Sequence, residues 1–515
     1  MDLGERTGTW VQRFTGGCLL AVVLLVLVHP RPSIYPPDRW VVTPVVLLVV
    51  AAVAALWWSG RLRSPSWSER AWRRVGLGAG VASTLIAGLV AWGSAYRTTW
   101  DAELVHLASY SKFSMSQHAA YFSRFPNNRV LLAVARLANT LDREVGGGYA
   151  LWWAIVNTLI VAGTVALVWW CARRIAGARA GALSLVPFTL LVSLSPWLSV
   201  PYTDLLALWS PVAALAASLM AIERRGARAA LWWAMTGASL GVGYAIKVTP
   251  LVGLVAVVLA ILVRRGAWLT RAAAIGVCAV ACLVSAWGVN QAAISMSGLS
   301  GLTPGISASP WTYVASGIRT SPGIGGGVYY GLFSDDIEHR TTGLPTGQQA
   351  QIARQMVRDT IERRGARGMA SFAVNKTIFN WGDGTFWAYG EGHDRFEPPM
   401  RSDPVSRAVQ GFAAPSGSAW QLHVDVAQIG WLLLLVLAGV GLLRSRYRFD
   451  LLVMATSLLG IAAFTDLFQG RSRYLLGHVP MICVLAAVVL PIALAPRSAS
   501  EEPVDDAPAA EPVEP

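Results

Sequence analysis

Long apolar segments recur along this chain and are separated by short clusters of arginine. CLLAVVLLVLV (18–28) and VVTPVVLLVVAAVAALWW (41–58) are long enough, or nearly so, to cross the hydrocarbon core of a bilayer. The pattern continues almost to the end of the chain. It predicts an all-α polytopic membrane protein with about twelve transmembrane helices, at 17–28, 41–58, 76–95, 150–172, 180–197, 204–222, 229–245, 250–263, 269–288, 426–443, 451–467 and 475–494.

Composition indicates the same class of protein. Of 515 residues, 54% are hydrophobic and 14% are charged, whereas a soluble protein carries about 25% charged residues. The net charge of +13 does not indicate a nucleic-acid partner, because much of it is arginine at predicted helix ends, where the positive-inside rule places it. All five cysteines lie in apolar runs, which argues against disulfides and a zinc site.

The arginine clusters also predict the orientation. Placing them inside leaves both termini in the cytoplasm of a multi-pass plasma-membrane protein. The preference for arginine over lysine fits a GC-rich bacterial genome. The first span follows Arg6 and Arg13 and lacks a small-residue cleavage site, so we expect it to remain as an anchor.

This orientation holds only if residues 127–143 do not cross the membrane. There Arg129, Arg136 and Arg143 recur every seven residues and line one helical face, which is typical of a helix lying in the interface. Interfacial helices and a mixed extracytoplasmic loop region therefore complete the expected fold. The predicted organisation is an N-terminal two-helix segment (1–75), a membrane core (76–288) with a first outer loop (97–149), an extracytoplasmic region (289–424), C-terminal transmembrane helices (425–495) and a disordered acidic tail (496–515).

An acidic motif, TTWDAELV, follows the predicted span 76–95. Its Asp101 and Glu103 are two residues apart at the membrane rim. Asp101 could cap a helix, with Glu103 favoured by the helix dipole. Alternatively, one carboxylate removes a proton from an attacking hydroxyl, or the two hold a divalent cation such as Mg or Mn. The sequence makes no cofactor certain.

Further candidate residues lie at predicted outer helix ends. In YFSRFPNN, either Asn127 or Asn128 caps the next helix, or both contact a sugar or phosphate with Arg124. Tyr202 and Asp204 lie in the proline-rich motif SPWLSVPYTD, which suggests a shaped rim.

Three lysines are retained in this arginine-rich chain, and two of them lie near candidate motifs. Lys247, in GYAIKVTP, either snorkels to headgroups or binds a lipid phosphate. NKTIFNWGDGTFWAYGEG contains Lys376, Asp383 and Glu391, which are candidate substrate-binding residues. Its aromatics could form an interfacial belt, or they could stack on a sugar while Asp383 or Glu391 accepts hydrogen bonds from the sugar hydroxyls.

The last predicted span begins with QGRSRYLLGHVP. The positive-inside rule disfavours Arg471 and Arg473 on the outer side, beside Tyr474. Arginine binds phosphate through a planar fork of donors. A phosphate site is therefore predicted here.

Taken in order, these motifs resemble the GT-C superfamily of membrane glycosyltransferases, and most of all bacterial enzymes similar to protein mannosyltransferases and aminoarabinose transferases. The resemblance covers roughly residues 76–495. It rests on the acidic motif, the FPNNRVLLAVARL helix, PYTD (201–204), WGDGTF (381–386) and RSRYLLGHVP (471–480).

The resemblance implies a cavity open to the outer leaflet and a polyprenyl-phosphate sugar as donor. It further implies that Asp101 is the base or a metal partner and that Arg471 and Arg473 hold the lipid phosphate. This chain has Asp-Ala-Glu where the family has adjacent acids. The choice between Asp101 and Glu103, and the need for a metal, therefore stay open.

The resulting hypothesis is an inverting sugar transfer at the extracytoplasmic face. The acceptor is a cell-envelope glycan, lipid or protein, and membrane lipids surround the enzyme. Two other functions stay open. A transporter or lipid flippase would concentrate ionisable groups near the bilayer midplane, and a glycan polymerase or ligase would transfer whole oligosaccharides.

Overall fold

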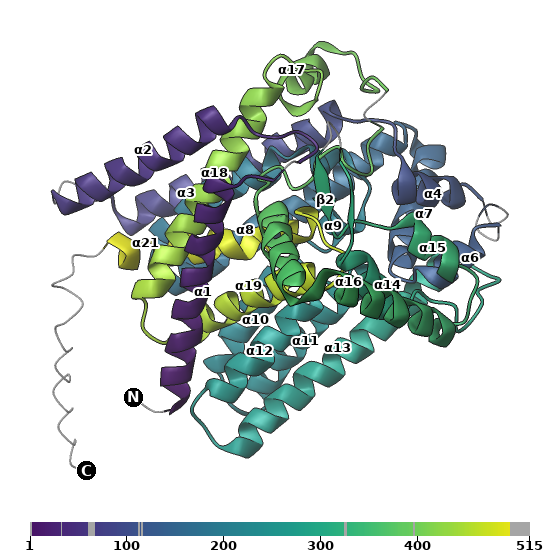
Figure 1. Cartoon of the computed structure of the whole chain (residues 1–515). Coiled ribbons are helices and arrows are strands. Elements are labelled where there is room, and N and C mark those ends of the chain that lie inside the picture. The colour runs from purple at the N-terminus through teal and green to yellow at the C-terminus, as the bar shows by residue number, and fades with distance from the viewer. Residues whose placement is uncertain are drawn as a thin grey trace.

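The structure is a computed structural model, and it describes residues 3–31, 33–59, 67–111, 114, 117–323, 327–394 and 397–494. The predicted tail 496–515 lies outside these residues. The described chain is mainly helical (Figure 1). Its first helices are α1 (Leu3–Val28), α2 (Arg39–Trp58), α3 (Glu69–Gly93), α4 (Trp100–Ser109), α6 (Ala119–Arg124), α7 (Asn128–Val145), α8 (Tyr149–Phe188), α9 (Thr203–Leu206), α10 (Ser210–Ile222), α11 (Gly226–Ile246), α12 (Leu251–Val263) and α13 (Trp268–Ser297).

The second half adds a region that contains a two-stranded ribbon, followed by the last helices of the bundle. It comprises α14 (Pro310–Gly317), β1 (Thr320–Pro322), β2 (Val328–Tyr330), α15 (Asp335–Thr341), α16 (Thr346–Trp381), α17 (Pro404–Ala413), α18 (Trp420–Arg444), α19 (Phe449–Leu467), α20 (Arg473–Leu476) and α21 (Val479–Leu494). β1 and β2 form an antiparallel ribbon in which Thr320 pairs with Tyr330.

Each predicted span coincides with helical structure, so the all-α polytopic fold is confirmed. Within the described residues, eight helices are long and apolar enough to cross a membrane. The predicted spans 150–172 and 180–197 are the two arms of α8 and its short extension, joined at a kink where Gly177 takes φ +85°. A glycine adopts this left-handed conformation without the steric penalty of a side chain.

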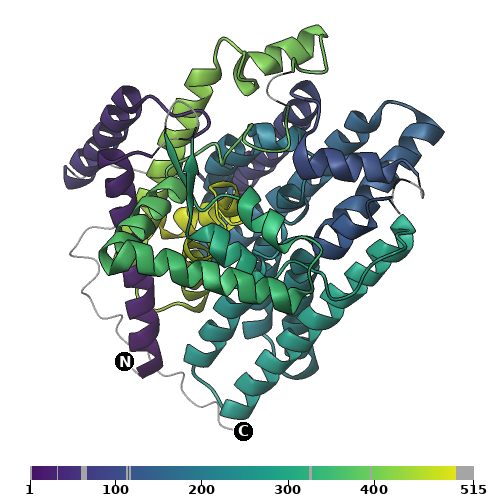
Figure 2. The same ribbon diagram turned by 45° about the vertical axis from the view of Figure 1, so that its right-hand side comes forward.

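The N-terminal helices pack against the C-terminal ones. α1 lies along α18 and α19, and α2 contacts α18 (Figures 1 and 2). Leu19 of α1, Leu435 of α18 and Cys483 of α21 belong to one buried apolar cluster. The two ends of the sequence therefore share a core.

The helix predicted at 127–143 is α7. Leu131, Leu132 and Ala135 are buried on one side of it, and it packs against α4 and α13. Among the described helices, α7 is not one of those apolar enough to span a membrane. Its packing against α4 positions the acidic motif next to the membrane bundle.

Candidate functional site

Asp101 lies in the first turn of α4 and points at another element. α4 begins at Trp100, with Thr99 at the N-cap position, so the prediction that Asp101 itself caps the helix is wrong. Its Oδ2 accepts a hydrogen bond of 2.7 Å from the Tyr202 hydroxyl, which comes from the loop before α9. This bond fixes the Asp101 carboxylate against the rim motif PYTD.

Two tyrosines, the buried Tyr202 and the partly buried Tyr121, lie beside this carboxylate. Burial, and then the negative charge of Asp101, raise the pKa of Tyr202 well above its ordinary value. The same two causes raise the pKa of Tyr121. Both phenols therefore stay protonated and serve as donors. Asn128 in turn donates to the Tyr121 hydroxyl at 2.5 Å, and Asn127 donates to the Asn128 side chain at 3.0 Å.

Neither Asn127 nor Asn128 caps α7 through its side chain. Asn127 stands at the N-cap position of α7 without a capping hydrogen bond, and Asn128 orients Tyr121. Tyr121 itself was not singled out by the sequence. The feature of the sequence that could have indicated Tyr121 is its position seven residues before Asn128.

Glu103 does not join this cluster. Residues two apart on a helix point about 200° apart around its axis, and Glu103 is half-buried on the other side of α4 from Asp101. Among the described residues, no group of three or more His, Cys, Asp or Glu side chains could hold a metal ion. Asp101 and Glu103 therefore do not come together as a pair of metal ligands. Because Mg²⁺ can be held by a single carboxylate together with water and a substrate phosphate, metal use at Asp101 stays a prediction.

Two arginines converge on one carboxylate close by. Arg471 and Arg473 both form ion pairs with Glu391. The three side chains are 5%, 8% and 16% exposed, respectively. The Arg473 guanidinium also lies 4.9 Å from the ring centroid of Tyr202. Tyr202 therefore contacts both the acidic group and the basic group.

The loop 382–394 carries Glu391 to this position. Asp383 is the anchor of the loop. It accepts hydrogen bonds from the Ser33 and Ser472 hydroxyls at 3.0 and 2.9 Å, from the backbone nitrogens of Thr385 and Trp387 at 3.0 and 2.8 Å, and from the Thr385 hydroxyl at 2.6 Å. With these partners the buried Asp383 carboxylate fixes the start of the loop, and the sugar-binding role of Asp383 stays a prediction.

The far end of the same loop is joined to the residues before α4. His393 forms an isolated β-bridge with Thr98, and the Thr99 backbone nitrogen donates to Gly392 at 3.1 Å. Phe386 and Trp387 take positive φ angles of 56° and 64°, conformations that bulky residues keep only when their surroundings fix them. The loop therefore links the acidic motif directly to the Glu391–arginine cluster.

A second buried ion pair, between Lys247 and Asp204, completes the cluster. The Lys247 ammonium lies 4.4 Å from the ring centroid of Tyr474. Burial lowers the pKa of Lys247 to about 8, while the Asp204 carboxylate opposes this change. The snorkelling alternative predicted for Lys247 is therefore wrong, because its amine points into the protein.

Several buried polar atoms here have no hydrogen-bond partner among the described residues. They include Asp204 Oδ2, the Nε atoms of Arg471 and Arg473, and both ring nitrogens of His478. His478 is fully buried and belongs to the terminal motif, but it was not singled out by the sequence. Unsatisfied buried groups are uncommon in proteins and need an explanation. Several such atoms at one place are typical of a site that binds a polar ligand.

Two predicted ligand residues, Arg124 and Lys376, have partners within the protein. Arg124 forms a bidentate ion pair with Glu338 at 2.6 and 2.7 Å, and this ties α6 to α15. The fully buried Lys376 donates to the carbonyls of Gly317, Asp466 and Phe468 at 2.7, 2.9 and 2.7 Å. Because its ammonium binds these three carbonyls, Lys376 fixes the turn after α19 that precedes Arg471 and Arg473.

The fold and the buried polar cluster define an all-α integral membrane protein with a site at the ends of its helices. A family model described as "Conserved hypothetical integral membrane protein" matches residues 38–494, and the chain belongs to that family. The matched residues include α2, whereas the resemblance described from the sequence begins at about residue 76. Among curated proteins, none matches this chain.

A solved structure similar to this chain is the archaeal oligosaccharyltransferase AglB from Archaeoglobus fulgidus, in complex with an inhibitory peptide and a dolichol-phosphate. The sequence identity is 15% and the TM-score is 0.39. The similarity covers 83% of this chain and 51% of that chain. The present chain therefore spans about half the length of that enzyme.

Proposed function

We propose that the chain is a GT-C type membrane glycosyltransferase. It moves a sugar from a polyprenyl-phosphate donor to a cell-envelope acceptor at the extracytoplasmic face of a bacterial plasma membrane. The observation that carries the proposal is the buried cluster that joins a carboxylate, Asp101, to paired cations, Arg471 and Arg473, through Tyr202. Transfer from a lipid phosphate needs both a base and a site for an anionic leaving group.

The base is Asp101. Its carboxylate takes the proton of the acceptor hydroxyl, whose oxygen attacks the anomeric carbon as the bond from that carbon to the phosphate oxygen breaks. A single displacement of this kind inverts the anomeric configuration. Tyr202 and Tyr121 stay protonated and hold the carboxylate in place. General-base assistance of this kind is worth roughly 10²–10⁴-fold in rate.

The leaving phosphate is received by Arg471 and Arg473, with support from Lys247. Preorganised cations aimed at a developing negative charge are among the strongest contributions to catalysis. In the structure Glu391 forms ion pairs with both arginines, and its single negative charge balances one of their two positive charges. The donor phosphate must therefore take over these arginines from Glu391 when it binds. The unpartnered Nε atoms of both arginines support this exchange, because a phosphate offers more acceptor oxygens than one carboxylate.

The test is sugar transfer by the purified protein in detergent, from radiolabelled polyprenyl-phosphate sugars to envelope acceptors, with and without EDTA. We expect transfer, and the effect of EDTA shows whether a metal is needed. Product size separates the transfer of one sugar from polymerase or ligase activity. If the protein binds polyprenyl phosphate and scrambles it in liposomes, but transfers no sugar, the proposal is overturned in favour of a flippase.

A further inference from the structure

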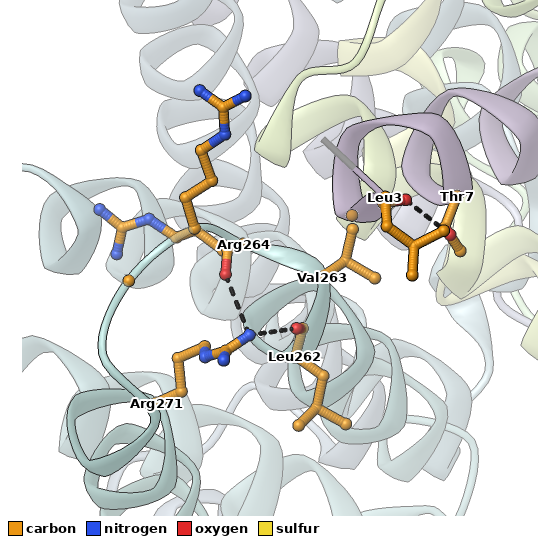
Figure 3. Close-up of a pocket in the computed structure, with 9 residues that line it drawn as sticks. Leu3, Thr7, Leu262, Val263, Arg264 and Arg271 are labelled. Carbon is orange, nitrogen blue, oxygen red and sulfur yellow. Dashed lines mark hydrogen bonds between the residues drawn. The ribbon is translucent and has the colours of Figure 1, made fainter. Parts of the chain in front are cut away.

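A basic hollow opens at the opposite end of the chain's fold from α4, where α12 turns into α13 beside the first turn of α1 (Figures 1 and 3). Its volume is about 480 Å³, within the roughly 300–1,000 Å³ of typical ligand pockets. The lining includes Leu3, Thr7, Leu262 and three arginines, Arg264, Arg265 and Arg271. None of these residues belongs to the proposed catalytic cluster.

The hollow carries positive charge that its neighbours only partly balance. Among the described lining residues there is no carboxylate. Glu5, next to the lining, pairs with Arg265 at 3.2 Å. Arg264 donates to the Ile222 carbonyl at 3.2 Å, and Arg271 donates to the Leu262 and Arg264 carbonyls at 2.8 and 3.3 Å. Because those carbonyls are neutral acceptors, the contacts given for Arg264 and Arg271 within the described part of the chain do not balance their charge.

The Arg271 side chain is fixed by the protein and has one donor without a partner among the described residues. Its two bonds to carbonyls fix the guanidinium at the end of α12 (Figure 3). Its buried Nε atom has no hydrogen-bond partner within the described part of the chain. A guanidinium fixed in this way can bind a phosphate oxygen with little further loss of conformational freedom.

An apolar surface lies directly beside the hollow. Trp268 and Leu269, in the first turn of α13, are 61% and 79% exposed. The Arg271 guanidinium lies 5.9 Å from the Trp268 ring centroid. Exposed tryptophan next to arginine is typical of the level at which lipid headgroups meet the hydrocarbon core. A molecule bound in the hollow would therefore lie at headgroup depth, with apolar surface next to it for its chains.

We propose that this hollow binds the phosphate headgroup of an anionic membrane lipid. The guanidinium groups supply the phosphate contacts, Leu3 and Leu262 supply part of the apolar wall, and Trp268 and Leu269 face the acyl chains. Basic pockets between transmembrane helices are used to bind anionic headgroups. The proposal does not depend on the glycosyl transfer proposed above.

The experiment measures lipid binding to the full-length protein by native mass spectrometry from a neutral detergent. Phosphatidylglycerol is titrated against phosphatidylcholine for the wild type, for Arg264→Gln/Arg271→Gln and for the control Arg70→Gln/Arg74→Gln. The control removes two exposed arginines of α3, so the change in net charge is the same. We expect the first variant to lose phosphatidylglycerol affinity roughly thirtyfold and the control to retain it.

Two results would overturn the proposal. One is equal loss of affinity in the two double variants, which would assign the binding to overall charge. The other is displacement of the lipid by inorganic phosphate as effectively as by short-chain phosphatidylglycerol, which would indicate a free-anion site. If Arg264→Gln/Arg271→Gln fails to fold, as shown by its elution and thermal unfolding, Arg264→Gln alone provides the comparison with phosphatidylcholine.

Discussion

Asp101 and Tyr202 are 101 positions apart in the sequence and meet through one hydrogen bond of 2.7 Å. The sequence marks each of them as a rim residue, but it contains no signal that pairs them. Tyr202→Phe removes this bond and keeps the ring beneath Arg473. A hydrogen bond to a charged group is worth about 1.5–3 kcal/mol, so we expect the kcat of transfer to fall roughly 10–100-fold. Steady-state kinetics with the donor varied provide the measurement.

The hydroxyl of Tyr389 provides the control for this substitution. It donates to the Ala413 carbonyl at 2.5 Å, within the aromatic packing around Tyr35 and Trp420. Tyr389→Phe should lower thermal stability and leave kcat nearly unchanged. Equal losses of kcat in the two variants would mean that Tyr202 acts only through the fold.

Glu391 distinguishes two interpretations of the arginine cluster. If Glu391 is the counter-charge that the donor replaces, Glu391→Gln leaves two buried arginines without a carboxylate. The variant alone should then unfold at a lower temperature, because breaking a buried ion pair costs about 3–5 kcal/mol. Polyprenyl phosphate should bind it more tightly than it binds the wild type and should restore its stability. Calorimetry and thermal unfolding, with and without the lipid, test this prediction.

The sequence left open a different role for Glu391, in which it accepts hydrogen bonds from the sugar. Under that role Glu391→Gln would weaken binding of the donor sugar and leave binding of polyprenyl phosphate unchanged. Unchanged lipid affinity in the variant would therefore contradict the exchange with the donor phosphate. Position in the sequence does not separate the two roles, because they differ only in which side chains the folded loop brings together.

The lowered pKa of Lys247 predicts that donor binding and transfer depend on pH. Burial lowers its pKa to about 8, whereas an unfolded lysine titrates near 10.4. Donor binding that relies on the ammonium should weaken as pH rises through about 8, and transfer should fall with it. Lys247→Arg keeps the charge and should move this fall to higher pH. A pH profile of kcat/KM for both proteins gives the measurement, and identical profiles would contradict the role of Lys247.

The stability effect of Lys247 has the opposite sign. Between about pH 8 and 10.4 the unfolded chain binds more protons at Lys247 than the folded chain does. This residue therefore makes the fold more stable as pH rises through that window. A loss of transfer there cannot be attributed to unfolding caused by Lys247.

At the scale of elements, the loop 382–394 links α4, α16 and the terminal motif. Asp383 fixes its start through buried hydrogen bonds to Ser33, Thr385, Trp387 and Ser472. Asp383→Ala leaves several of these donors unpaired, and each unsatisfied buried group costs about 1–3 kcal/mol. We expect a marked fall in the unfolding temperature and loss of transfer, because Glu391 and the link to Thr98 lose their support.

A matched aspartate lies on α17. Asp403 caps that helix through Ser406 at the surface, so Asp403→Ala should cost about 1 kcal/mol and leave transfer intact. Comparable losses of stability in the two variants, measured by thermal unfolding in detergent, would show that Asp383 does not anchor the loop.

Hydrophobic patterning predicts the membrane helices well because a bilayer requires long apolar segments with internally bonded backbones. It predicts α7 equally well, because arginines at seven-residue spacing leave the opposite face apolar. The kink at Gly177 and the course of the loop 382–394 were not predictable in this way. Both depend on φ angles and on contacts between residues that are far apart in the sequence.

At the scale of the molecule, the proposed site draws on residues from Asp101 to His478. Packing of α1 against α18 and α19 joins the two ends of the chain, and Ser33 contributes a hydrogen bond to Asp383. The acidic motif, the rim aspartate and the terminal arginines were all found from sequence. The sequence did not predict the ion pairs of Arg124 and Arg473 or the three carbonyls that bind Lys376. A charged residue at a helix end gives the same sequence pattern whether its partner is a ligand or a neighbouring side chain.

The most direct test of the proposed function compares Asp101→Asn with Glu103→Gln, measuring both sugar transfer and binding of polyprenyl phosphate. The two changes are chemically matched on one helix, but only Asp101 contacts Tyr202. We predict that Asp101→Asn lowers transfer by roughly 10²–10⁴-fold, with normal expression and lipid binding, and that Glu103→Gln retains near-normal transfer. Full transfer by Asp101→Asn, or its loss only in Glu103→Gln, would contradict the assignment of Asp101 as the base.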